Sequence, residues 1–548
     1  MYNQVPGQIG VPIQCENAAS VQNKPNLVII MADDLGSHDI SLRGSNEILT
    51  PNIDALGYQG TIFNHHYTCA MCTPTRAALL TGKYPIHMGM QHYVLRTGEP
   101  RGLPLNEKLL PEYLKEVGYK THIIGKWHLG FAKKSFIPTN RGFESHIGYL
   151  GAFIDYFDST VRFNNSPFSP GFDFRRNESV YRDRVGEYLT DVLTDEASKI
   201  IRGHDPLQGP LFLYLSHQAP HAANDDDPLQ TTSEDIEKMQ HIQDPKRRAY
   251  AAMVRALDRS VGRVIRVLEE KEMLKNTVIL FFSDNGGPTL GLYNNRAFNY
   301  PLRGQKNGPW EGSFRGTAIL WSPLLRKRHY VSKHLIHITD WLPTFANLAG
   351  ATSYKYKKLD GYDIWLTASN NLPPIRREIL HNINPIDGYS SFYRDGWKYV
   401  NGTTLAGQYD SWLGNISQES FPENLNYPEL VMNSDVWQTL NPFAAKILKT
   451  KDIEAIRKNT KIKCGKRIPF SRTCEPLKAP CLFYLTKDPC EISNLAHFRP
   501  VRMQVIKERL EHYEKSSIPP SNLPPDPESD PALNDYLWTW WLEKDDKR

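Results

Sequence analysis

The sequence contains no long hydrophobic run. Its longest apolar stretches, Leu27–Ala32 and Thr277–Phe282, are far shorter than the roughly 18–20 residues that a membrane-spanning helix needs. The first residues, MYNQVPGQIGVPIQ, contain no hydrophobic core of a signal peptide. The sequence therefore predicts no membrane span. It describes either a cytosolic protein or a secretory protein from which a signal peptide has been removed.

The sequence also lacks a strong excess of charge, an internal repeat and any low-complexity tract. Its 65 basic and 60 acidic side chains leave a formal net charge of only +5, which gives no sign of a nucleic-acid partner. A small positive excess suits an anionic substrate, but an ordinary solvated surface explains it equally well. With 548 residues, the chain is too long for one ordinary core and predicts a large and a small domain.

Cysteines are few, and their positions are uneven. The seven are Cys15, Cys69, Cys72, Cys464, Cys474, Cys481 and Cys490. Four of them lie between residues 464 and 490, as expected for disulfides formed in an oxidising compartment. If Cys72 has a separate role, six remain, and the sequence does not reveal their connectivity. Together with four Asn-x-Ser/Thr sequons, at Asn164, Asn177, Asn401 and Asn415, this favours the secretory pathway, with a lysosomal or secreted destination.

Strand-like and helix-like segments alternate over residues 25–375. The strands are NLVIIMADD, THIIGKWHLG, PLFLYLSHQAPH and TVILFFSDNGG, and the helices are PTRAALLTGKY, residues 244–272 and residues 339–350. Such alternation predicts an α/β domain with a mostly parallel sheet between layers of helices. Each of these strands ends in polar residues, and ligands bind at the carboxyl ends of strands in open α/β sheets. We therefore expect these polar residues to converge at one edge of the sheet.

The pattern changes near residue 370, where LTASNNLPPIRRE has the composition of a linker. SSFYRDGWKYVNG then predicts a hairpin that turns at Asp395-Gly396. The division we expect is an N-terminal extension over residues 1–24, a catalytic domain over 25–375 and a C-terminal domain over 376–548. The C-terminal domain should be α+β, with a four-stranded antiparallel sheet and a tail.

Three carboxylates and an amide, arranged as two pairs, form the first candidate site. Asp33 and Asp34 follow one apolar strand, and Asp284 and Asn285 follow another. Carboxylate and amide oxygens suit Ca²⁺ or Mg²⁺ better than zinc, which usually takes His or Cys. Capping of a helix or a turn explains any one of these residues, but both pairs at strand ends favour a metal site.

Cys72 and Arg76 form the second candidate site. They open the helix CTPTR…, where the free N–H groups and the helix dipole attract an anion. A buried cysteine, a disulfide partner or a redox pair would also explain Cys72, because Cys69-Ala-Met-Cys72 matches C-x-x-C. A thioredoxin-like redox protein is a small βαβ fold, which this long α/β domain does not resemble.

The remaining polar residues suit a tetrahedral anion beside a metal. Lys126 and His128 lie in GKWH, His217 and His221 in HQAPH, and Lys306 in RGQK. Lysine can hold an oxyanion, and histidine can transfer protons near neutral pH. Each residue alone is equally well explained as a surface charge or a satisfied core histidine.

Taken together, these motifs resemble a known family. CTPTR followed by AALLTGKYP resembles the sulfatase signature C-x-P-x-R…T-G, and MADDLG, GKWHLG, HQAPH, SDNGG and KNGPWEGSFRG occur in family order and spacing. CLFYLTKDPCEISNLA resembles the family's C-terminal segment. The resemblance covers about residues 25–515 and is to the formylglycine-dependent type I sulfatases. Gly89-Met-Gln-His92 and the form GKWHLG are shared in particular with arylsulfatase B and its near relatives.

The resemblance implies a fold, a cofactor and roles for the site residues. The fold would be the alkaline-phosphatase-like mixed sheet flanked by helices, and Cys72 would be converted to formylglycine by the formylglycine-generating enzyme. One Ca²⁺ would be bound by Asp33, Asp34, Asp284, Asn285 and residue 72. Arg76 and Lys126 would hold the formylglycine hydrate, His128 would pair with one of its hydroxyls, and His221 and Lys306 would face the sulfate and the leaving oxygen.

The resemblance also implies a reaction. One hydroxyl of the hydrate would attack sulfur while Asp284 accepts its proton and His221, helped by Lys306, protonates the leaving alcohol. The product is a covalent sulfoenzyme. His128 would then deprotonate the second hydroxyl, so that sulfate leaves and the aldehyde returns.

Several alternatives for function remain open. A phosphoric or phosphonic ester hydrolase of the same superfold would more often use Ser or Thr with two zinc ions, which CTPTR and a single oxygen site disfavour. A non-catalytic glycan-binding relative would be expected to have lost a site residue, and every position is filled. The resemblance suggests a sulfated sugar of the N-acetylgalactosamine 4-sulfate type, or alternatively a small sulfated metabolite such as a glucosinolate.

Tyr93, Tyr156, Tyr293 and Trp310 are candidate pocket residues, although core packing explains each equally well. The oligomeric state is not indicated.

Overall fold

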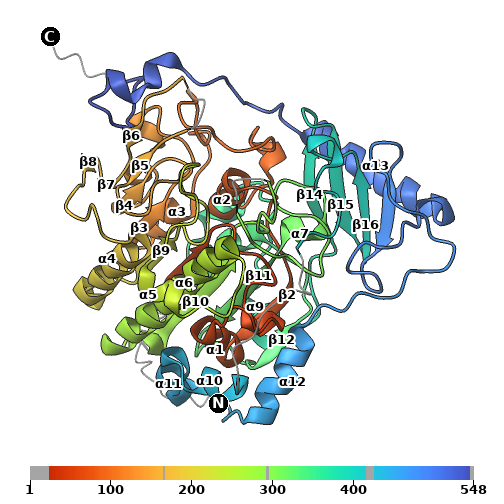
Figure 1. Cartoon of the computed structure of the whole chain (residues 1–548), viewed down its shortest axis with the longest axis horizontal. Coiled ribbons are helices and arrows are strands. Elements are labelled where there is room, and N and C mark those ends of the chain that lie inside the picture. The colour runs from red at the N-terminus through yellow and green to blue at the C-terminus, as the bar shows by residue number, and fades with distance from the viewer. Residues whose placement is uncertain (1–23, 164–166, 292–294, 415–424, 544–548) are drawn as a thin grey trace, which may run out of the picture.

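A large mixed β-sheet is the centre of the protein. Figure 1 shows a computed structural model of the chain, which describes residues 24–163, 167–291, 295–414 and 425–543. Five neighbouring strands run parallel in the order β10-β1-β9-β3-β4. Their bounds are Thr277–Ser283, Asn26–Ala32, Leu211–Ser216, Lys120–Lys126 and Ser145–Tyr149. The parallel order of these strands confirms the α/β domain predicted from the sequence.

Antiparallel strands extend the sheet on both sides. Beyond β10 lie β11 (Arg315–Trp321) and β2 (Thr61–Tyr67), which pair antiparallel. The short β12 (Tyr330–Ser332) and β13 (Ile336–His337) run parallel to β2, and β7 (Arg175–Arg176) and β8 (Ser179–Val180) follow β4 on the other side. The sheet is therefore mixed, with its parallel part in the middle.

Every residue of β9 and β10 is buried. Because neighbouring strand residues point to opposite faces, both faces of the sheet are covered, and helices provide this cover. In one group, α6 (Pro245–Glu270) contacts both α1 (Pro51–Gln59) and α4 (Leu189–Gly203). In another, α2 (Cys72–Thr81), α3 (Leu110–Glu116) and α8 (Trp341–Leu348) contact one another. Asp244 starts α6 as the sequence predicts, since its carboxylate accepts the N–H groups of Lys246 and Arg247.

Two details differ from the prediction near residues 340 and 370. Asp340 precedes α8 but makes no side-chain cap. Its carboxylate instead accepts the N–H of His337 and pairs with Arg376. A buried guanidinium without a counter-charge costs more free energy than a helix end without a side-chain cap. The segment expected to be a linker begins with a short helix, α9 (Trp365–Asn370).

A second, four-stranded antiparallel sheet follows, as expected. Its order is β14-β15-β16-β17, with bounds Glu378–Asn384, Tyr389–Arg394, Trp397–Asn401 and Cys481–Tyr484. Asp395 and Gly396 form the predicted turn between β15 and β16, both with positive φ. The helix α13 (Pro500–Ser516) packs Ile506, Leu510 and Tyr513 into the same core cluster as this sheet.

Other parts of the last third of the chain lie against the large sheet. The helices α10 (Tyr427–Met432) and α11 (Asp435–Leu440) contact α1, and α12 (Thr450–Thr460) contacts β12. In Figure 1 these three helices lie at the bottom, whereas the chain after α13 crosses the top toward β6 (Gly171–Phe172). There Trp538 donates its backbone N–H to Phe172. The predicted domain boundary at residue 375 stays a prediction.

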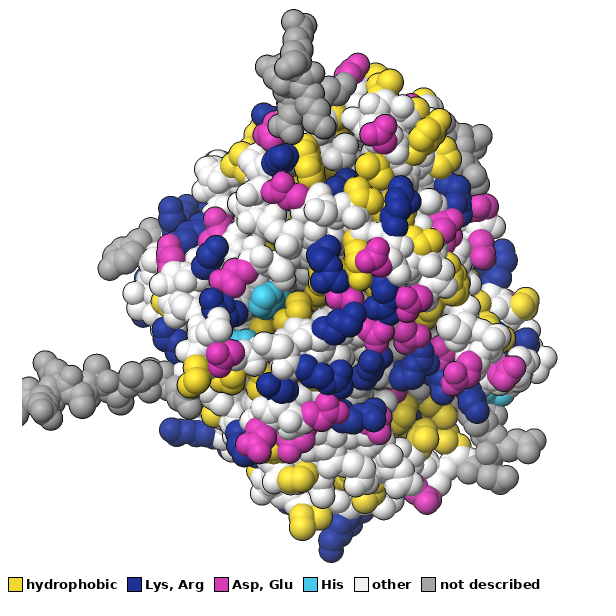
Figure 2. Space-filling view, turned by 90° about the vertical axis from the view of Figure 1, so that its left-hand side faces the viewer, with side chains coloured by type: hydrophobic (Ala, Val, Ile, Leu, Met, Phe, Trp, Pro, Cys, Tyr) yellow, Lys and Arg dark blue, Asp and Glu magenta, His cyan; other side chains and the backbone are white. Residues whose placement is uncertain are grey.

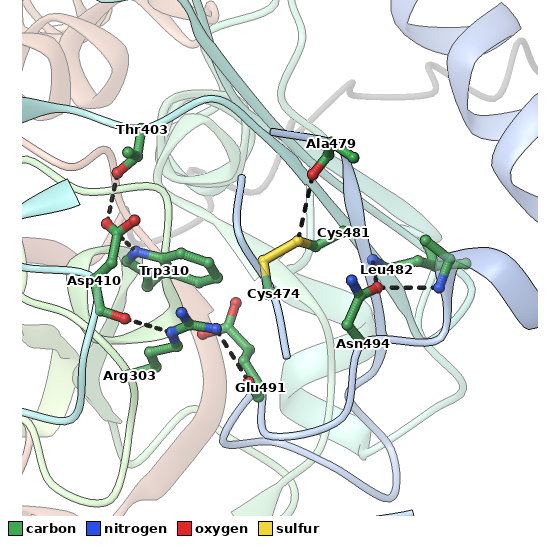
Figure 3. Close-up of a disulfide and its surroundings, with 11 residues drawn as sticks. Arg303, Trp310, Thr403, Asp410, Cys474, Ala479, Cys481, Leu482, Glu491 and Asn494 are labelled. Atoms are coloured by element: carbon green, nitrogen blue, oxygen red, sulfur yellow. Dashed lines mark hydrogen bonds between the residues drawn. A yellow bond between two sulfur atoms is a disulfide. The ribbon is translucent and has the colours of Figure 1, made fainter. Parts of the chain in front are cut away.

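Two disulfides stabilise the loops beside the small sheet. They join Cys464 to Cys490 and Cys474 to Cys481, and Figure 3 shows the second one. Cys69 and Cys72 are buried and form no disulfide, and Cys15 lies outside the described residues. The expected clustering of disulfides between residues 464 and 490 is therefore confirmed.

The surface beside α4 and α6 carries charges of both signs. Figure 2 shows Lys and Arg side chains interspersed with Asp and Glu on this face, and the pairs include Arg259–Asp191, Arg263–Asp195 and Arg202–Glu270. Across the described residues, no helix is long and apolar enough to cross a membrane. Of the sequons, Asn177 is exposed and Asn401 is half-buried, while Asn164 and Asn415 lie outside the described residues.

Candidate active site

The predicted polar residues do converge at one edge of the large sheet. Asp33 and Asp34 follow β1, Asp284 follows β10, Lys126 ends β3, and His221 follows β9. These four strands are neighbours in the sheet and run in the same direction. Their carboxyl ends therefore bring together residues up to 251 positions apart, as between Asp34 and Asn285.

The acidic residues form a compact, fully buried group. Asp33, Asp34, Asp284 and Asn285 are each 0% exposed. The carboxylate of Asp284 accepts the backbone N–H of Asp34 at 3.2 Å, and the Asn285 amide donates to Asp34 Oδ1 at 2.6 Å. Burial and then the charge of Asp33 raise the pKa of Asp284. Crowding of three carboxylates in a dry site is costly unless cations balance them.

Two oxygens in this group fit a divalent cation. Asp34 Oδ2 and Asn285 Oδ1 are buried and accept no hydrogen bond within the described residues. One ligand atom each from Asp33, Asp34, Cys72 and His221 lies within 4.8 Å of the others. Carboxylate and amide oxygens are ligands for a hard cation, so the residues present fit a divalent metal ion.

Cys72 is the first residue of α2 and faces the acidic group. Its Sγ lies 3.5 Å from Asp33 Oδ1, and the side chain is 1% exposed. Burial, followed by the charges of Asp284 and Asp33, raises the pKa of the Cys72 thiol, and burial raises the pKa of Cys69 to about 12. Redox cysteine pairs usually have a lowered pKa, so the redox interpretation of C-x-x-C finds no support here.

Three basic side chains balance the carboxylates. Arg76 donates to Asp33 and Asp284 at 3.2 and 2.9 Å, and it also donates to Ser216 at 2.6 Å. The ammonium of Lys126 lies 2.5 Å from Asp33 Oδ2, and that of Lys306 lies 2.6 Å from Asp34 Oδ1. The site therefore holds as many basic groups as carboxylates before any metal ion or substrate anion is counted.

These cations also decide the ionisation of Asp33. Burial opposes the charged form, but Lys126, His221 and Arg76 together outweigh burial and hold the pKa of Asp33 below its usual value. Asp33 is therefore a carboxylate at neutral pH, as an oxygen ligand for a metal must be.

The two candidate histidines differ in their hydrogen bonds. His128 Nε2 lies 2.9 Å from the carbonyl of Leu95, while its Nδ1 is buried and has no hydrogen-bond partner within the described residues. His221 Nδ1 lies 2.6 Å from its neighbour's carbonyl, Ala222 O, and its Nε2 lies 3.5 Å from Asp34 Oδ2. A ring nitrogen next to a carbonyl must carry the proton. His128 Nδ1 is thus an acceptor, and burial keeps the pKa of His128 well below its usual value.

The backbone at the site is locally strained. Asp34 and His128 have φ of 62° and 57°, a left-handed conformation that is uncommon for residues other than glycine. Gly286, after the acidic pair, has the carbonyl of Gly312 where a Cβ would lie, at 1.7 Å. Only glycine lets the loop after β10 approach the short helix that follows the Lys306 loop this closely.

A cavity of about 640 Å³ opens above Cys72. Cys72, His128, His221 and Lys306 line it, so the structure brings these predicted residues to one cavity. His217 does not line it, and its Nε2 lies 2.9 Å from the Ser260 hydroxyl. Of the candidate pocket aromatics, Tyr93 lines the cavity, Tyr156 and Trp310 are buried in the core, and Tyr293 lies outside the described residues.

Trp310 has a structural environment instead. Figure 3 shows Arg303 beside its ring, with the guanidinium carbon 3.5 Å from the ring centre. The indole N–H donates to Asp410 at 2.7 Å, and Thr403 donates to the same carboxylate oxygen. This network connects the loop after Lys306 to the segment that follows β16 and is not part of the cavity wall.

Sequence reasoning missed most of the cavity wall. Phe153, Phe163 and Phe168 line it from the segment after β4, and Pro525 and Pro527 line it from the C-terminal tail. No local pattern marks these residues, because each belongs to an irregular segment whose position depends on tertiary packing.

The fold, and a cavity lined by Cys72, two histidines and a lysine beside buried carboxylates, are those expected of a hydrolase for an anionic ester. The family model for sulfatases matches residues 25–351, and the chain belongs to the sulfatase family. It is therefore a sulfuric ester hydrolase. The mixed sheet with its helical layers is the alkaline-phosphatase-like fold that the resemblance implied.

Similar proteins are found in animals and among solved structures. Mouse arylsulfatase J is 37% identical over 528 residues, which cover 96% of this chain and 82% of that protein. Dog N-acetylgalactosamine-6-sulfatase is 32% identical over 63% of this chain and 66% of that enzyme. The crystal structure of Ps i-CgsB has a TM-score of 0.69 and 27% identity, covering 91% of this chain and 94% of that one.

Proposed function

We propose that this sulfatase uses a formylglycine made from Cys72, with one Ca²⁺ bound beside it. The observation that carries the proposal is the position of Cys72. Its Sγ lies at the start of a helix, 3.5 Å from Asp33, with Lys306, His128 and His221 lining the cavity above it. A plain thiol here is a poor nucleophile, because burial raises its pKa. A modified residue 72 accounts for a cysteine in this environment.

Asp33, Asp34, Asp284, Asn285 and residue 72 would hold the cation. The two oxygens without hydrogen bonds, Asp34 Oδ2 and Asn285 Oδ1, support this assignment. With residue 72 as formylglycine, all the proposed ligands are oxygens, which favours Ca²⁺ over zinc. The bound cation would supply electrostatic stabilisation of negative charge at the sulfuryl oxygens.

The formylglycine hydrate would supply two hydroxyls on one carbon, one to attack sulfur and one whose deprotonation expels sulfate. Arg76 and Lys126 would orient residue 72, since they hold the carboxylate of Asp33 next to it. Lys306 would bind a sulfuryl oxygen from the cavity. Preorganised cations of this kind stabilise charge that develops in the transition state.

Three groups would move protons. Asp284 would accept the proton of the attacking hydroxyl, and His221 would donate a proton from Nε2 to the leaving alcohol oxygen. His128 would accept the proton of the second hydroxyl at Nδ1, the nitrogen that has no partner within the described residues. The Leu95 carbonyl at 2.9 Å from Nε2 fixes the tautomer that this role requires.

The burial of Cys72 bears on maturation. At 1% exposure the side chain is inaccessible to another enzyme, so the formylglycine-generating enzyme would act before this part of the chain folds. Two disulfides and the exposed sequon at Asn177 support a secretory compartment, either the lysosome or the extracellular space.

Two substrate classes are candidates, and the first is a sulfated sugar of the N-acetylgalactosamine 4-sulfate type. Names of similar proteins support a sulfated sugar, among them N-acetylgalactosamine-6-sulfatase and Ps i-CgsB in complex with k-i-k-neocarrahexaose. A small sulfated metabolite, glucosinolates among them, is the second candidate, and the apolar wall of the cavity favours it.

Mass spectrometry of the tryptic peptide over residues 44–76 tests the proposal. Conversion of the Cys72 thiol to an aldehyde lowers the peptide mass by about 18 Da. The protein should come from a host that co-expresses the converting enzyme. An active protein whose residue 72 is still a thiol would contradict the proposed nucleophile, and so would activity that survives Cys72→Ala.

A further inference from the structure

The cavity above Cys72 has a polar floor and an apolar wall. Cys72, His128, His221 and Lys306 form the floor. The wall comes mainly from Val94, Phe153, Phe163, Phe168, Pro525 and Pro527. Phe153 stacks on the His221 ring, with centroids 5.8 Å apart, and meets Phe163 edge-on at 5.6 Å. An aromatic surface therefore continues directly from the proposed proton donor toward the opening.

The C-terminal tail supplies the other side of this wall. Asp526 donates its backbone N–H to Gly98 at 2.8 Å, and Leu523 donates to the Glu99 carboxylate at 2.7 Å. Farther along, Trp538 is fully buried and stacks edge-on with Phe168 at 6.0 Å. In Figure 1 the tail crosses the top of the molecule from α13 toward β6. Both ends of the crossing are anchored, so Pro525 and Pro527 form a fixed wall.

Few charged groups lie above the floor. Among the described residues that line the cavity, Arg96 is the only basic side chain besides Lys306 and the histidines, and Asp530 is acidic. A sulfated glycan chain carries repeated anions and many hydroxyls, each of which needs a polar partner when it leaves water. The cavity provides one cationic floor for one sulfate group, and an apolar surface for the alcohol portion of the ester.

We propose that this wall selects sulfate monoesters of compact, apolar alcohols, and that Phe163 and Phe168 are specificity-determining residues. The inference rests on the proposed sulfatase reaction at residue 72 and names the substrate class of that site. A cavity of about 640 Å³ is of the size that holds one small molecule. The aromatic rings would pack against the alcohol portion, while Lys306 binds the sulfate.

The test compares two esters with similar leaving groups. 2-Phenylethyl sulfate and galactose 6-sulfate are both sulfates of primary alcohols, and they differ in whether the alcohol is apolar or hydroxylated. The quantity measured is the ratio of kcat/KM for the phenylethyl ester to kcat/KM for the sugar ester. Because the intrinsic reactivity of each ester is the same for every enzyme variant, a change in this ratio reports only on the protein.

Phe163→Ser and Phe168→Ser should each lower this ratio by about tenfold or more, as expected when an apolar contact with the substrate is lost. Phe498→Ser is the matched control, because Phe498 is 43% exposed and lies outside this cavity. Its ratio should equal that of the wild type. An unchanged ratio in both wall variants would overturn the inference, and so would a wild-type preference for a sulfated oligosaccharide over both small esters.

A binding measurement separates this inference from the proposed reaction. Cys72→Ala should be inactive but should still bind 2-phenylethyl sulfate in calorimetry, and adding Phe168→Ser should weaken that binding about tenfold. If the wild type with formylglycine hydrolyses no sulfate ester, an aryl sulfate included, the proposed function fails whatever the binding shows. If hydrolysis occurs but Phe168→Ser leaves binding unchanged, the apolar wall is not the selector.

Discussion

Lys398 of β16 and Glu311 of α7 (Glu311–Phe314) form an ion pair in which both side chains are 0% exposed, with Nζ 3.0 Å from Oε1. Lys398 also lies 2.8 Å from Glu491, and Tyr67 of β2 donates its hydroxyl to Glu311 at 2.8 Å. This buried network joins the small sheet to the edge of the large sheet, a few residues after Lys306. The position of Lys306 thus depends on contacts made by the last third of the chain.

Lys398→Met should destabilise the protein by about 3–5 kcal/mol, because it removes the buried cation that Glu311 and Glu491 share. Glu311 would then keep Arg315, at 3.6 Å, as its basic partner. The measurement is the free energy of unfolding in urea. Lys478→Met is the matched control, since Lys478 pairs with Glu475 at the surface, and the change there should be about 0–1 kcal/mol. Equal stability of Lys398→Met and the wild type would show that the buried network contributes nothing.

Cys72→Ser should stop after one turnover. A serine hydroxyl can displace the alcohol from sulfur, but residue 72 then has no second hydroxyl to expel the sulfate. Intact-mass measurement after incubation with an aryl sulfate should show an added sulfate of about 80 Da. Cys69→Ser should remain active, because Cys69 does not line the cavity. Steady turnover by Cys72→Ser would be incompatible with the proposed reaction.

Removal of the metal should abolish activity. Chelation with EGTA should inactivate the enzyme, and added Ca²⁺ should restore the activity. The bound cation would then again balance the negative charge of the substrate sulfate. Asp34→Asn should weaken Ca²⁺ binding in equilibrium dialysis by at least about tenfold, whereas Asp435→Asn, at an exposed carboxylate on α11, should not. Full activity in EGTA, with no calcium in the protein, would refute the cation site.

Asp258→Asn should change how stability depends on pH. Asp258 lies on α6, and its carboxylate accepts the backbone N–H groups of Asn52 and Ile53 on α1. Burial raises the pKa of Asp258 from 3.8 to about 7. The folded state therefore holds the proton more tightly than the unfolded state, and this contribution to stability is lost as pH rises from about 4 to 7. Asparagine has no such proton to lose.

Urea unfolding of both proteins at pH 4.5 and pH 8 provides the measurement. Relative to the wild type, Asp258→Asn should gain roughly 2–4 kcal/mol between the two pH values. Comparing the two proteins at each pH cancels the contribution of buried histidines such as His217, whose pKa falls to about 3 through burial. A difference that is the same at both pH values would mean that Asp258 is ionised in the folded protein throughout this range.

The strands and the residues that follow them are predictable from the amino-acid sequence alone. β1, β9 and β10 are short apolar runs that end in Asp, His or Asn, and parallel strands place such ends at one edge. The start of α2 at Cys72 and the turn at Asp395-Gly396 were readable for the same reason, since helix starts and tight turns depend on a few neighbouring residues.

Other features of the site depend on how distant parts of the chain pack together. Three such features join distant parts of the chain. The Leu95 carbonyl fixes the tautomer of His128, and Lys398 is buried between Glu311 and Glu491. Pro525 and Pro527 of the C-terminal tail line the cavity above Cys72. Irregular segments carry no periodicity that predicts where they lie, because their paths are set by packing against surfaces that exist only after folding. The chemistry of the site is therefore local in sequence, whereas the shape of its substrate cavity is not.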